Sequence, residues 1–101
     1  METESLTFKV AGTPYDGRQE VLKKIFSIQS FDIPVILKSE KDNEHDRFAV
    51  SVWKNKDKLG YVPRSLSQVV SESLQLLIDA KIDLFQENDL LCANLKLVFG
   101  E

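Results

Sequence analysis

The sequence predicts a mainly β fold with two helices (an α+β protein), and three observations lead to that prediction. Six short segments show strand-like alternation or β-branched residues, two segments carry apolar residues at helical spacing, and polar or Gly/Pro-containing turns separate them. The elements follow the order β-α-β-β-β-α-β-β. Six short strands and two helices favour an OB-like six-stranded antiparallel barrel, with an open α+β sheet as the alternative.

The N-terminal part predicts one strand and one helix. Residues Leu6 to Val10 alternate between apolar and polar, and this strand ends at the breaker Gly12-Thr13-Pro14. Asp16 is a candidate helix cap, with Gln19 three residues later as its capping-box partner. The apolar stripe that predicts the helix consists of Val21, Leu22, Ile25 and Phe26.

The middle of the chain predicts three strands and a long loop. Residues 33–38 are rich in β-branched side chains, and residues 39–46 contain no apolar member and form a loop. Residues 48–53 restart the alternation. Residues 55–58 then form a hairpin turn, and residues 59–62 return as the next strand.

The C-terminal part predicts a helix followed by a hairpin. Ser65 and Gln68 form a second candidate capping box, and the helix is expected to end near Ala80. Its apolar stripe consists of Leu66, Val69, Val70, Leu74, Leu77 and Ile78. Strands over residues 82–85 and 91–99 are then joined by a short polar turn.

Composition places the chain in an ordinary globular class. It has 101 residues, 43% hydrophobic and 29% charged, which is typical of one domain over residues 1–101 with a core spanning about 6–99. One cysteine and one histidine rule out an intramolecular disulfide and a four-ligand structural zinc site. The polar N-terminus and the lack of a long apolar run predict a soluble, cytoplasmic protein with no membrane partner.

The formal charge of −3 conceals an uneven distribution. Residues 38–64 carry seven basic and five acidic side chains, whereas residues 65–101 carry two basic and six acidic. The net charge argues against a surface that coats duplex DNA, which needs clustered Lys and Arg. The middle segment is the region that can face an anion, although its lysines also fit the solvation of edge strands.

Two catalytic possibilities receive little support. Cys92 lies in a predicted strand and His45 in a loop, and nothing in the sequence brings them together as a nucleophile and its base. Asp42, Glu44 and Asp46 alternate as candidate metal ligands, but no glycine or twelfth-position Glu completes a calcium loop. We expect a non-enzymatic protein with no cofactor, since no Gly-rich phosphate loop occurs either.

Four segments, in order, carry a resemblance to a known family. They are Gly12-Thr13-Pro14-Tyr15, Asn43-Glu44-His45-Asp46, Phe48-Ala49-Val50-Ser51-Val52 and Gly60-Tyr61-Val62-Pro63-Arg64. In this order and spacing, followed by an amphipathic helix, the chain resembles the HIRAN domain family over about residues 6–99. Glu44-His45 stands where the family loop has Pro-Tyr. The chain resembles the small standalone members, since it has no room for the helicase-like ATPase that others carry.

The resemblance implies an OB-like barrel that captures single-stranded DNA ends with a free 3′-OH, in a repair or replication context. The site residues that it implies are Tyr15, His45, Asp46 and Arg64, with Lys41 and Arg47 as helpers. In that site Tyr15 stacks on a base, and Asp46 accepts the 3′-OH and repels a 3′-phosphate. Arg64 pairs with a phosphate, and His45 offers a smaller stacking ring than the family's Tyr.

Two other functions remain open from the sequence. A protein-interaction or regulatory module on the same fold would suit the acidic composition and Glu44. A metal-dependent nuclease using Asp42, Glu44 and Asp46 ranks last. The candidate partners are single-stranded DNA ends and a helicase or nuclease as a partner protein.

Overall fold

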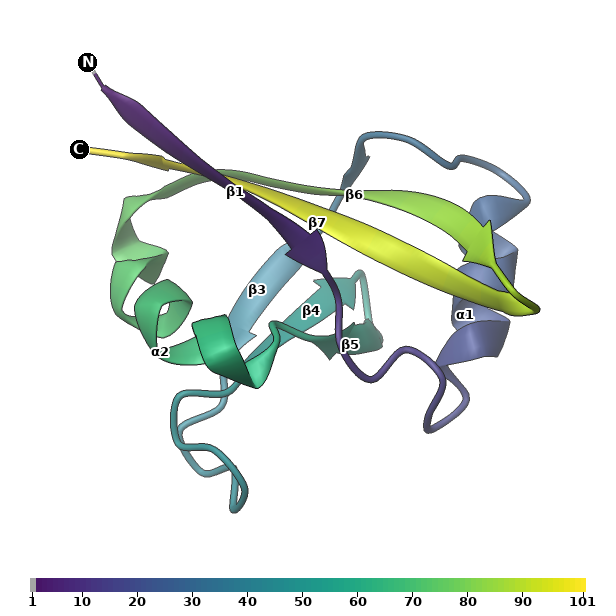
Figure 1. Ribbon diagram of the computed structural model, residues 1–101, viewed down its shortest axis with the longest axis horizontal. Coiled ribbons are helices and arrows are strands. Elements are labelled where there is room, and N and C mark those ends of the chain that lie inside the picture. The colour runs from purple at the N-terminus through teal and green to yellow at the C-terminus, as the bar shows by residue number, and fades with distance from the viewer. Residues whose placement is uncertain (1) are drawn as a thin grey trace.

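The computed structural model describes residues 2–101 and shows two antiparallel sheets with two helices (Figure 1). One sheet has the strand order β1-β7-β6-β2, and the other has the order β3-β4-β5. The strands are β1 (Thr3–Lys9), β2 (Ile33–Pro34), β3 (Ile36–Ser39), β4 (Val50–Lys54), β5 (Asp57–Tyr61), β6 (Leu77–Glu87) and β7 (Leu90–Gly100). The helices are α1 (Arg18–Phe26) and α2 (Arg64–Ser73), and a 3₁₀ turn, Leu74–Leu76, follows α2.

The predicted class, mainly β with two helices, is confirmed, whereas the closed six-stranded barrel is wrong. The predicted strand over residues 33–38 is split at Val35. Ile33 and Pro34 pair with β6, and Ile36–Ser39 pair with β4, so the chain passes here from one sheet to the other. The Val35 N–H donates to the Ala80 carbonyl at 3.1 Å. This crossing produces a seventh strand and two sheets that do not close on each other.

The second predicted helix is too long. Helix α2 ends at Ser73, and Leu77, Ile78 and Ala80 belong to β6. Apolar residues in this segment suit a helix and a strand equally well. The strand prevails because β6 pairs with β7 along nearly its whole length, which supplies backbone hydrogen bonds that an isolated helical turn would lack.

Both predicted helix caps are also wrong. The residue before α1 is Gly17 and the residue before α2 is Pro63, and neither helix has a side-chain cap. Asp16 instead adopts a left-handed conformation with φ of 57° and pairs with Arg18 at 3.3 Å. Ser65 lies inside the first turn of α2.

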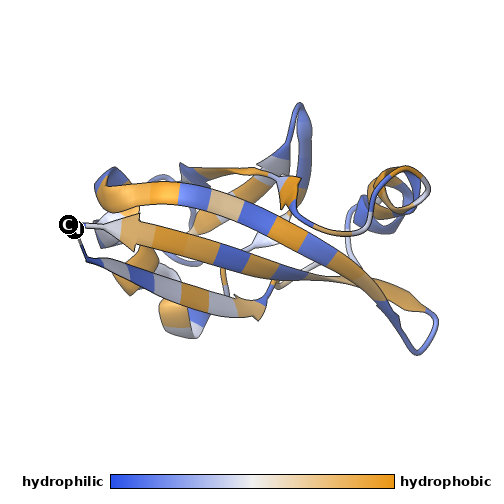
Figure 2. Cartoon of the chain, turned by 90° about the horizontal axis from the view of Figure 1, so that it is seen from above, coloured by the Kyte–Doolittle hydropathy of each residue, from blue (hydrophilic) through white to orange (hydrophobic). Residues whose placement is uncertain are grey.

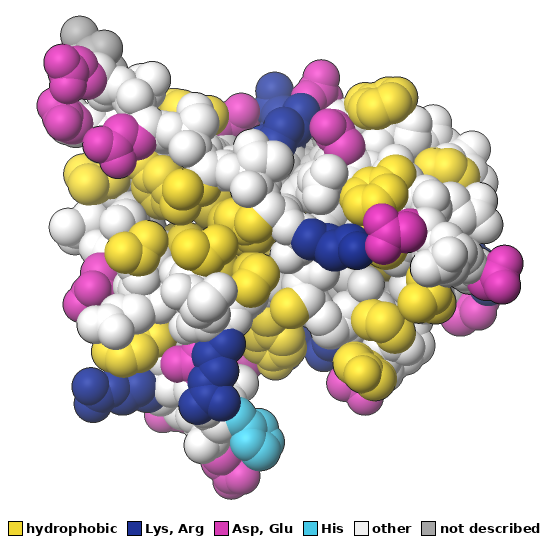
Figure 3. All heavy atoms as spheres, viewed as in Figure 1, with side chains coloured by type: hydrophobic (Ala, Val, Ile, Leu, Met, Phe, Trp, Pro, Cys, Tyr) yellow, Lys and Arg dark blue, Asp and Glu magenta, His cyan; other side chains and the backbone are white. Residues whose placement is uncertain are grey.

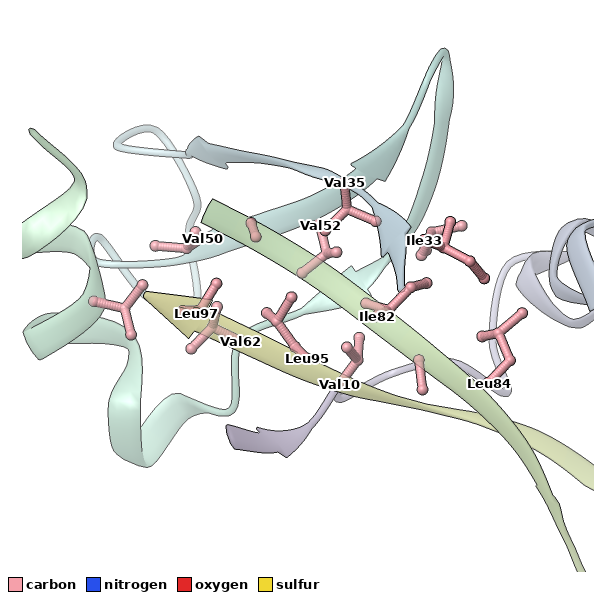
Figure 4. Packing of buried hydrophobic residues seen from close by; sticks show 14 of the residues in the cluster. Val10, Ile33, Val35, Val50, Val52, Val62, Ile82, Leu84, Leu95 and Leu97 are labelled. Carbon is pink, nitrogen blue, oxygen red and sulfur yellow. The ribbon is translucent and has the colours of Figure 1, made fainter. Parts of the chain in front are cut away.

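The core lies between the two sheets and contains side chains from both. Figure 2 shows the alternation of apolar and polar residues along the strands, and Figure 4 shows the apolar side chains meeting across the sheets. Ile82 and Leu95 are fully buried from the four-stranded sheet, and Val52 from the three-stranded sheet. Leu22 of α1 and Val70 of α2 are also fully buried, so the helices cover the core where the sheets leave it open. Among residues 2–101, neither helix is long or apolar enough to cross a membrane.

Candidate nucleic-acid interface

A cleft of about 290 Å³ opens where the loop before β4 meets the end of β5 and the start of α2. It is lined by Ala11, Asn43, His45, Asp46, Ala49, Tyr61, Val62 and Arg64. The loop projects from the body of the molecule in Figure 1, and its histidine is coloured cyan beside Lys and Arg side chains in Figure 3. Side chains from three separate parts of the sequence therefore meet at one place.

The wall formed by Tyr61 depends on a close approach between two backbone segments. Ala11 and Tyr61 exchange two backbone hydrogen bonds of 2.8 and 2.9 Å. At Gly60 a Cβ atom would clash with the Ala11 carbonyl oxygen. Glycine is therefore needed at this position for β5 to lie against the segment after β1.

The loop is organised by two side chains that accept backbone N–H groups. The Asn43 Oδ1 atom accepts from the N–H groups of His45 and Asp46, at 2.9 and 3.2 Å. Asp46 Oδ1 accepts from the Phe48 N–H at 2.8 Å, which is the turn contact typical of Asp. Asp46 Oδ2 accepts from the Ser67 hydroxyl at 2.7 Å, so this carboxylate connects the loop to α2.

The Asp46 carboxylate is held in its charged form. The hydrogen bond from Ser67 and the one from the Phe48 N–H hold its pKa below the ordinary value, and the charge of nearby Arg64 acts in the same direction. The cleft therefore presents an anionic acceptor beside a cation at neutral pH.

The Tyr61 side chain is fixed by a polar network. Its hydroxyl donates to Glu40 Oε1 at 3.1 Å and accepts from Lys58 Nζ at 2.9 Å. Lys58 Nζ also lies 2.8 Å from Glu40 Oε2, and the Arg18 guanidinium lies 5.4 Å from the centroid of the Tyr61 ring. Burial opposes the ionisation of Glu40, but hydrogen bonds, the one from Lys58 foremost, outweigh it and lower the pKa of Glu40 to about 2.

Three of the six predicted site residues, namely His45, Asp46 and Arg64, line the cleft itself. Tyr15 does not line the cleft; it lies on the turn before α1 with 67% of its surface exposed. Lys41 and Arg47 line a neighbouring hollow of about 380 Å³. Arg47 also lines a hollow of about 500 Å³ that shares His45, Asp46 and Arg64 with the cleft, so four of the six predicted residues meet there and Lys41 lies farther out.

Sequence reasoning missed Tyr61 and Asn43 as parts of the cleft. Tyr61 pairs with Ser51 across the β4–β5 ladder, and Ala49 follows the same alternation as Ser51. A signal was available, because the return strand of a hairpin places its last residue beside the loop that precedes the hairpin. The polar Asn43 gave no such signal, since Asn is common in any turn.

The catalytic alternatives gain no geometric support. Within residues 2–101, no group of three His, Cys, Asp or Glu side chains gathers closely enough to hold a metal ion, and this includes Asp42, Glu44 and Asp46. Cys92 is buried in β7, in the four-stranded sheet, whereas His45 is exposed on the loop before β4. The two residues do not share the cleft.

Comparison with known proteins supplies the family. No curated protein matches the chain. A crystal structure of a protein from Lactobacillus plantarum, from a structural genomics consortium, has a TM-score of 0.62 and 21% sequence identity, covering 98% of this chain and 100% of that one, which shows a shared fold. The sequence model of the HIRAN domain matches residues 3–88. HIRAN domains are generally associated with nucleic-acid binding and are typically non-catalytic modules, and this chain belongs to the HIRAN domain family.

Proposed function

We propose that this protein binds the ends of single-stranded DNA in the cleft and recognises a free 3′-OH. The observation that carries the proposal is the presence, in one cleft, of an aromatic ring, a carboxylate and a guanidinium from Tyr61, Asp46 and Arg64. A terminal nucleotide offers a base, a hydroxyl and a phosphate, which are the complementary groups. A helicase or nuclease that produces such ends is the partner protein we propose.

In the proposed complex, aromatic stacking holds the base of the terminal nucleotide. Tyr61 and His45 offer two aromatic rings within the cleft, and base–aromatic stacking contributes about 1–3 kcal/mol per base. Tyr15 has an exposed ring and lies four residues after Ala11, which lines the cleft. We assign to Tyr15 a contact with a neighbouring base.

Asp46 accounts for the end selectivity. Its two hydrogen bonds, from Phe48 and Ser67, occupy two of the about four acceptor positions of a carboxylate. The remaining positions are available to a 3′-OH donor. A 3′-phosphate at the same place would meet a carboxylate that is held charged, and the two anions would repel each other.

In the proposed complex, cations around the cleft bind the phosphates of the strand. Arg64 is exposed at the start of α2, and within residues 2–101 it forms no ion pair. A guanidinium with free donors binds phosphate through paired hydrogen bonds. Lys41 and Arg47, in the neighbouring hollow, extend this positive surface.

The test measures fluorescence anisotropy of 5′-labelled single strands that end in 3′-OH or 3′-phosphate, across a salt series. We expect tighter binding of the 3′-OH strand and a shallow salt dependence. Two or three phosphate contacts predict a slope of roughly −1.5 to −2 on a log–log plot, at about −0.7 per contact.

The control separates end recognition from general attraction. The variant Asp46→Asn should lose most of the preference for the 3′-OH. The variant Asp42→Asn, an exposed carboxylate of the same loop outside the cleft, should retain it. Equal and steeply salt-dependent binding of both ends by the wild type would contradict the proposal.

A protein-interaction function is the second candidate, and a groove of about 300 Å³ favours it. The apolar part of the groove is formed by Leu6, Val69, Leu76 and Phe99, with Glu4 and Glu101 at its rim. Val69 and Leu76 are 57% and 44% exposed, so this groove keeps two apolar side chains together at the surface. A failure of all single strands to bind at low salt would favour this candidate over DNA-end binding.

A further inference from the structure

Beyond the cleft lies the outer face of the three-stranded sheet, which carries a second hollow beside Trp53. Ala49, Ser51 and Trp53 alternate along one side of the chain through β4, and Ala49 lines the cleft. Tyr61, another cleft residue, is paired with Ser51 on β5. At about 3.3 Å per residue, Trp53 lies about 13 Å along the strand from Ala49. Ser51, between the two, is fully buried and accepts a hydrogen bond from the indole, so a ligand that leaves the cleft passes over Tyr61, Glu40 and Lys58 before it reaches Trp53.

Trp53 is held on this face rather than in the core. It is partly exposed, and its indole N–H donates to the Ser51 hydroxyl at 2.8 Å. The ammonium groups of Lys38 and Lys58 lie 4.3 and 5.4 Å from the centroid of the Trp53 ring. A hollow of about 330 Å³ adjoins the indole, and it is lined by the cations Arg18, Lys56 and Lys58 and by the carboxylates Asp16 and Asp57. The indole is therefore flanked by lysines on this surface.

Free positive charge is concentrated in the same part of the molecule. Within residues 2–101, seven of the 13 basic side chains form no ion pair, and six of these lie between residues 38 and 64. They are Lys38, Lys41, Arg47, Lys54, Lys56 and Arg64. In contrast, the lysines of the four-stranded sheet are paired, as in Lys96 with Asp32 at 2.7 Å. The charge that remains for an external anion is therefore on the side of the three-stranded sheet.

We propose that a single DNA strand held by its end in the cleft continues over this face, with Trp53 in contact with a further base and with Lys38 and Lys56 in contact with phosphates. The inference rests on the proposed function, because it extends the same strand. Lys38 is exposed on a flexible four-carbon stem, so it can exchange the indole for a phosphate. Glu40 on this face is neutralised by Lys58, at 2.8 Å.

The single tryptophan provides a direct probe. Thymidine trimers and nonamers that end in 3′-OH are titrated into the protein, and Trp53 emission is recorded beside the anisotropy of 5′-labelled strands. We expect the nonamer to quench the emission and to bind about fivefold or more tightly than the trimer, which is the lower end of one stacking contact. The trimer should leave the emission unchanged.

Two variants test whether the longer strand gains its affinity from the outer face of the three-stranded sheet. Lys38→Gln with Lys56→Gln, and separately Trp53→Leu, should bring the nonamer affinity down to that of the trimer and leave the trimer affinity unchanged. The matched control is Lys24→Gln, which removes an equally unpaired lysine from α1. Circular dichroism and thermal unfolding check that each variant is folded.

The outcomes distinguish the two proposals. If the trimer binds as tightly as the nonamer, the extended contact is overturned and end recognition stands. The same conclusion follows if the nonamer still binds more tightly in both the Lys38→Gln/Lys56→Gln and the Trp53→Leu variants. A trimer and a nonamer that both fail to bind would overturn the proposed function and this inference together. A loss of the length advantage in the Lys24→Gln control would also count against the extended contact.

Discussion

Single carboxylates determine the geometry of the cleft. Asp46 joins its loop to α2 through Ser67, and Glu40 fixes Tyr61 and Lys58. Both carboxylates are held ionised by hydrogen bonds, so each has its pKa below the ordinary value. At the scale of the residue, the cleft is therefore preorganised by two ionised carboxylates that hydrogen bonds hold in place.

The Glu40 network makes stability depend on pH. Its pKa is about 2 in the folded protein, below the ordinary 4.5, so its contribution is fully present above about pH 4.5 and is lost as pH falls toward 2. Urea unfolding at pH 7 and pH 3 should show wild type losing about 1–2 kcal/mol more than Glu40→Gln, because pH 3 is below the ordinary pKa and still above the folded one. Glu44→Gln, an exposed carboxylate nearby, is the control and should behave as wild type. Equal acid sensitivity of wild type and Glu40→Gln would refute this expectation.

At the scale of the element, the fold depends on positions where the chain leaves one pairing strand and begins to pair with another. The chain changes sheets at Val35, and β5 lies against Ala11 through Gly60. These junctions position the cleft, since Ala11 and Tyr61 both line it. Moving the backbone of Gly60 away from Ala11 should therefore lower the stability of the fold and distort the cleft at the same time.

A pair of glycine variants isolates that close approach. Gly60→Ala, at a φ of +156°, adds backbone strain and also places a Cβ against the Ala11 carbonyl, and it should lower the free energy of unfolding by about 2 kcal/mol or more. Gly17→Ala meets nothing within 4 Å, although its φ is +74°, and should cost only about 1 kcal/mol. Chemical unfolding measures both values. If the two substitutions cost the same, the contact with Ala11 does not matter as the structure indicates.

At the scale of the whole molecule, two sheets share one core. Leu59 from β5 and Leu97 from β7 are both fully buried in the same cluster. The surface is less uniform, because ion pairs cover the four-stranded sheet while unpaired cations remain over the three-stranded one. A molecule with a net charge of −3 can therefore still offer one surface to an anion.

A shared core predicts one cooperative unfolding transition. Leu59→Ala and Leu97→Ala should each lower the free energy of unfolding by about 2–5 kcal/mol, although they lie in different sheets. Trp53 emission reports on the three-stranded sheet and circular dichroism on all strands, and their midpoints should coincide in both variants. Separate midpoints would show that the sheets unfold independently.

Much of the site could be predicted from the sequence because it is local. The polar loop with Asp46, and Arg64 just after Pro63, lie within short motifs, and these residues do share the cleft. Tyr61 was missed although the hairpin places it beside the loop, and the predicted Tyr15 lies outside the cleft because its position depends on how distant segments pack. No local pattern states that Ala11 will pair with Tyr61, fifty residues away.

The amino-acid order alone specified the class of fold, the alternation of the strands, the polar loop and the location of the positive charge. These properties follow from side-chain period and composition, which each segment carries within itself. Only the tertiary structure decided that Val35 separates two strands, that Leu77 and Ile78 extend β6, and that two sheets form instead of a barrel. Those outcomes depend on which distant backbone satisfies each N–H and C=O group, and a local pattern does not contain that information.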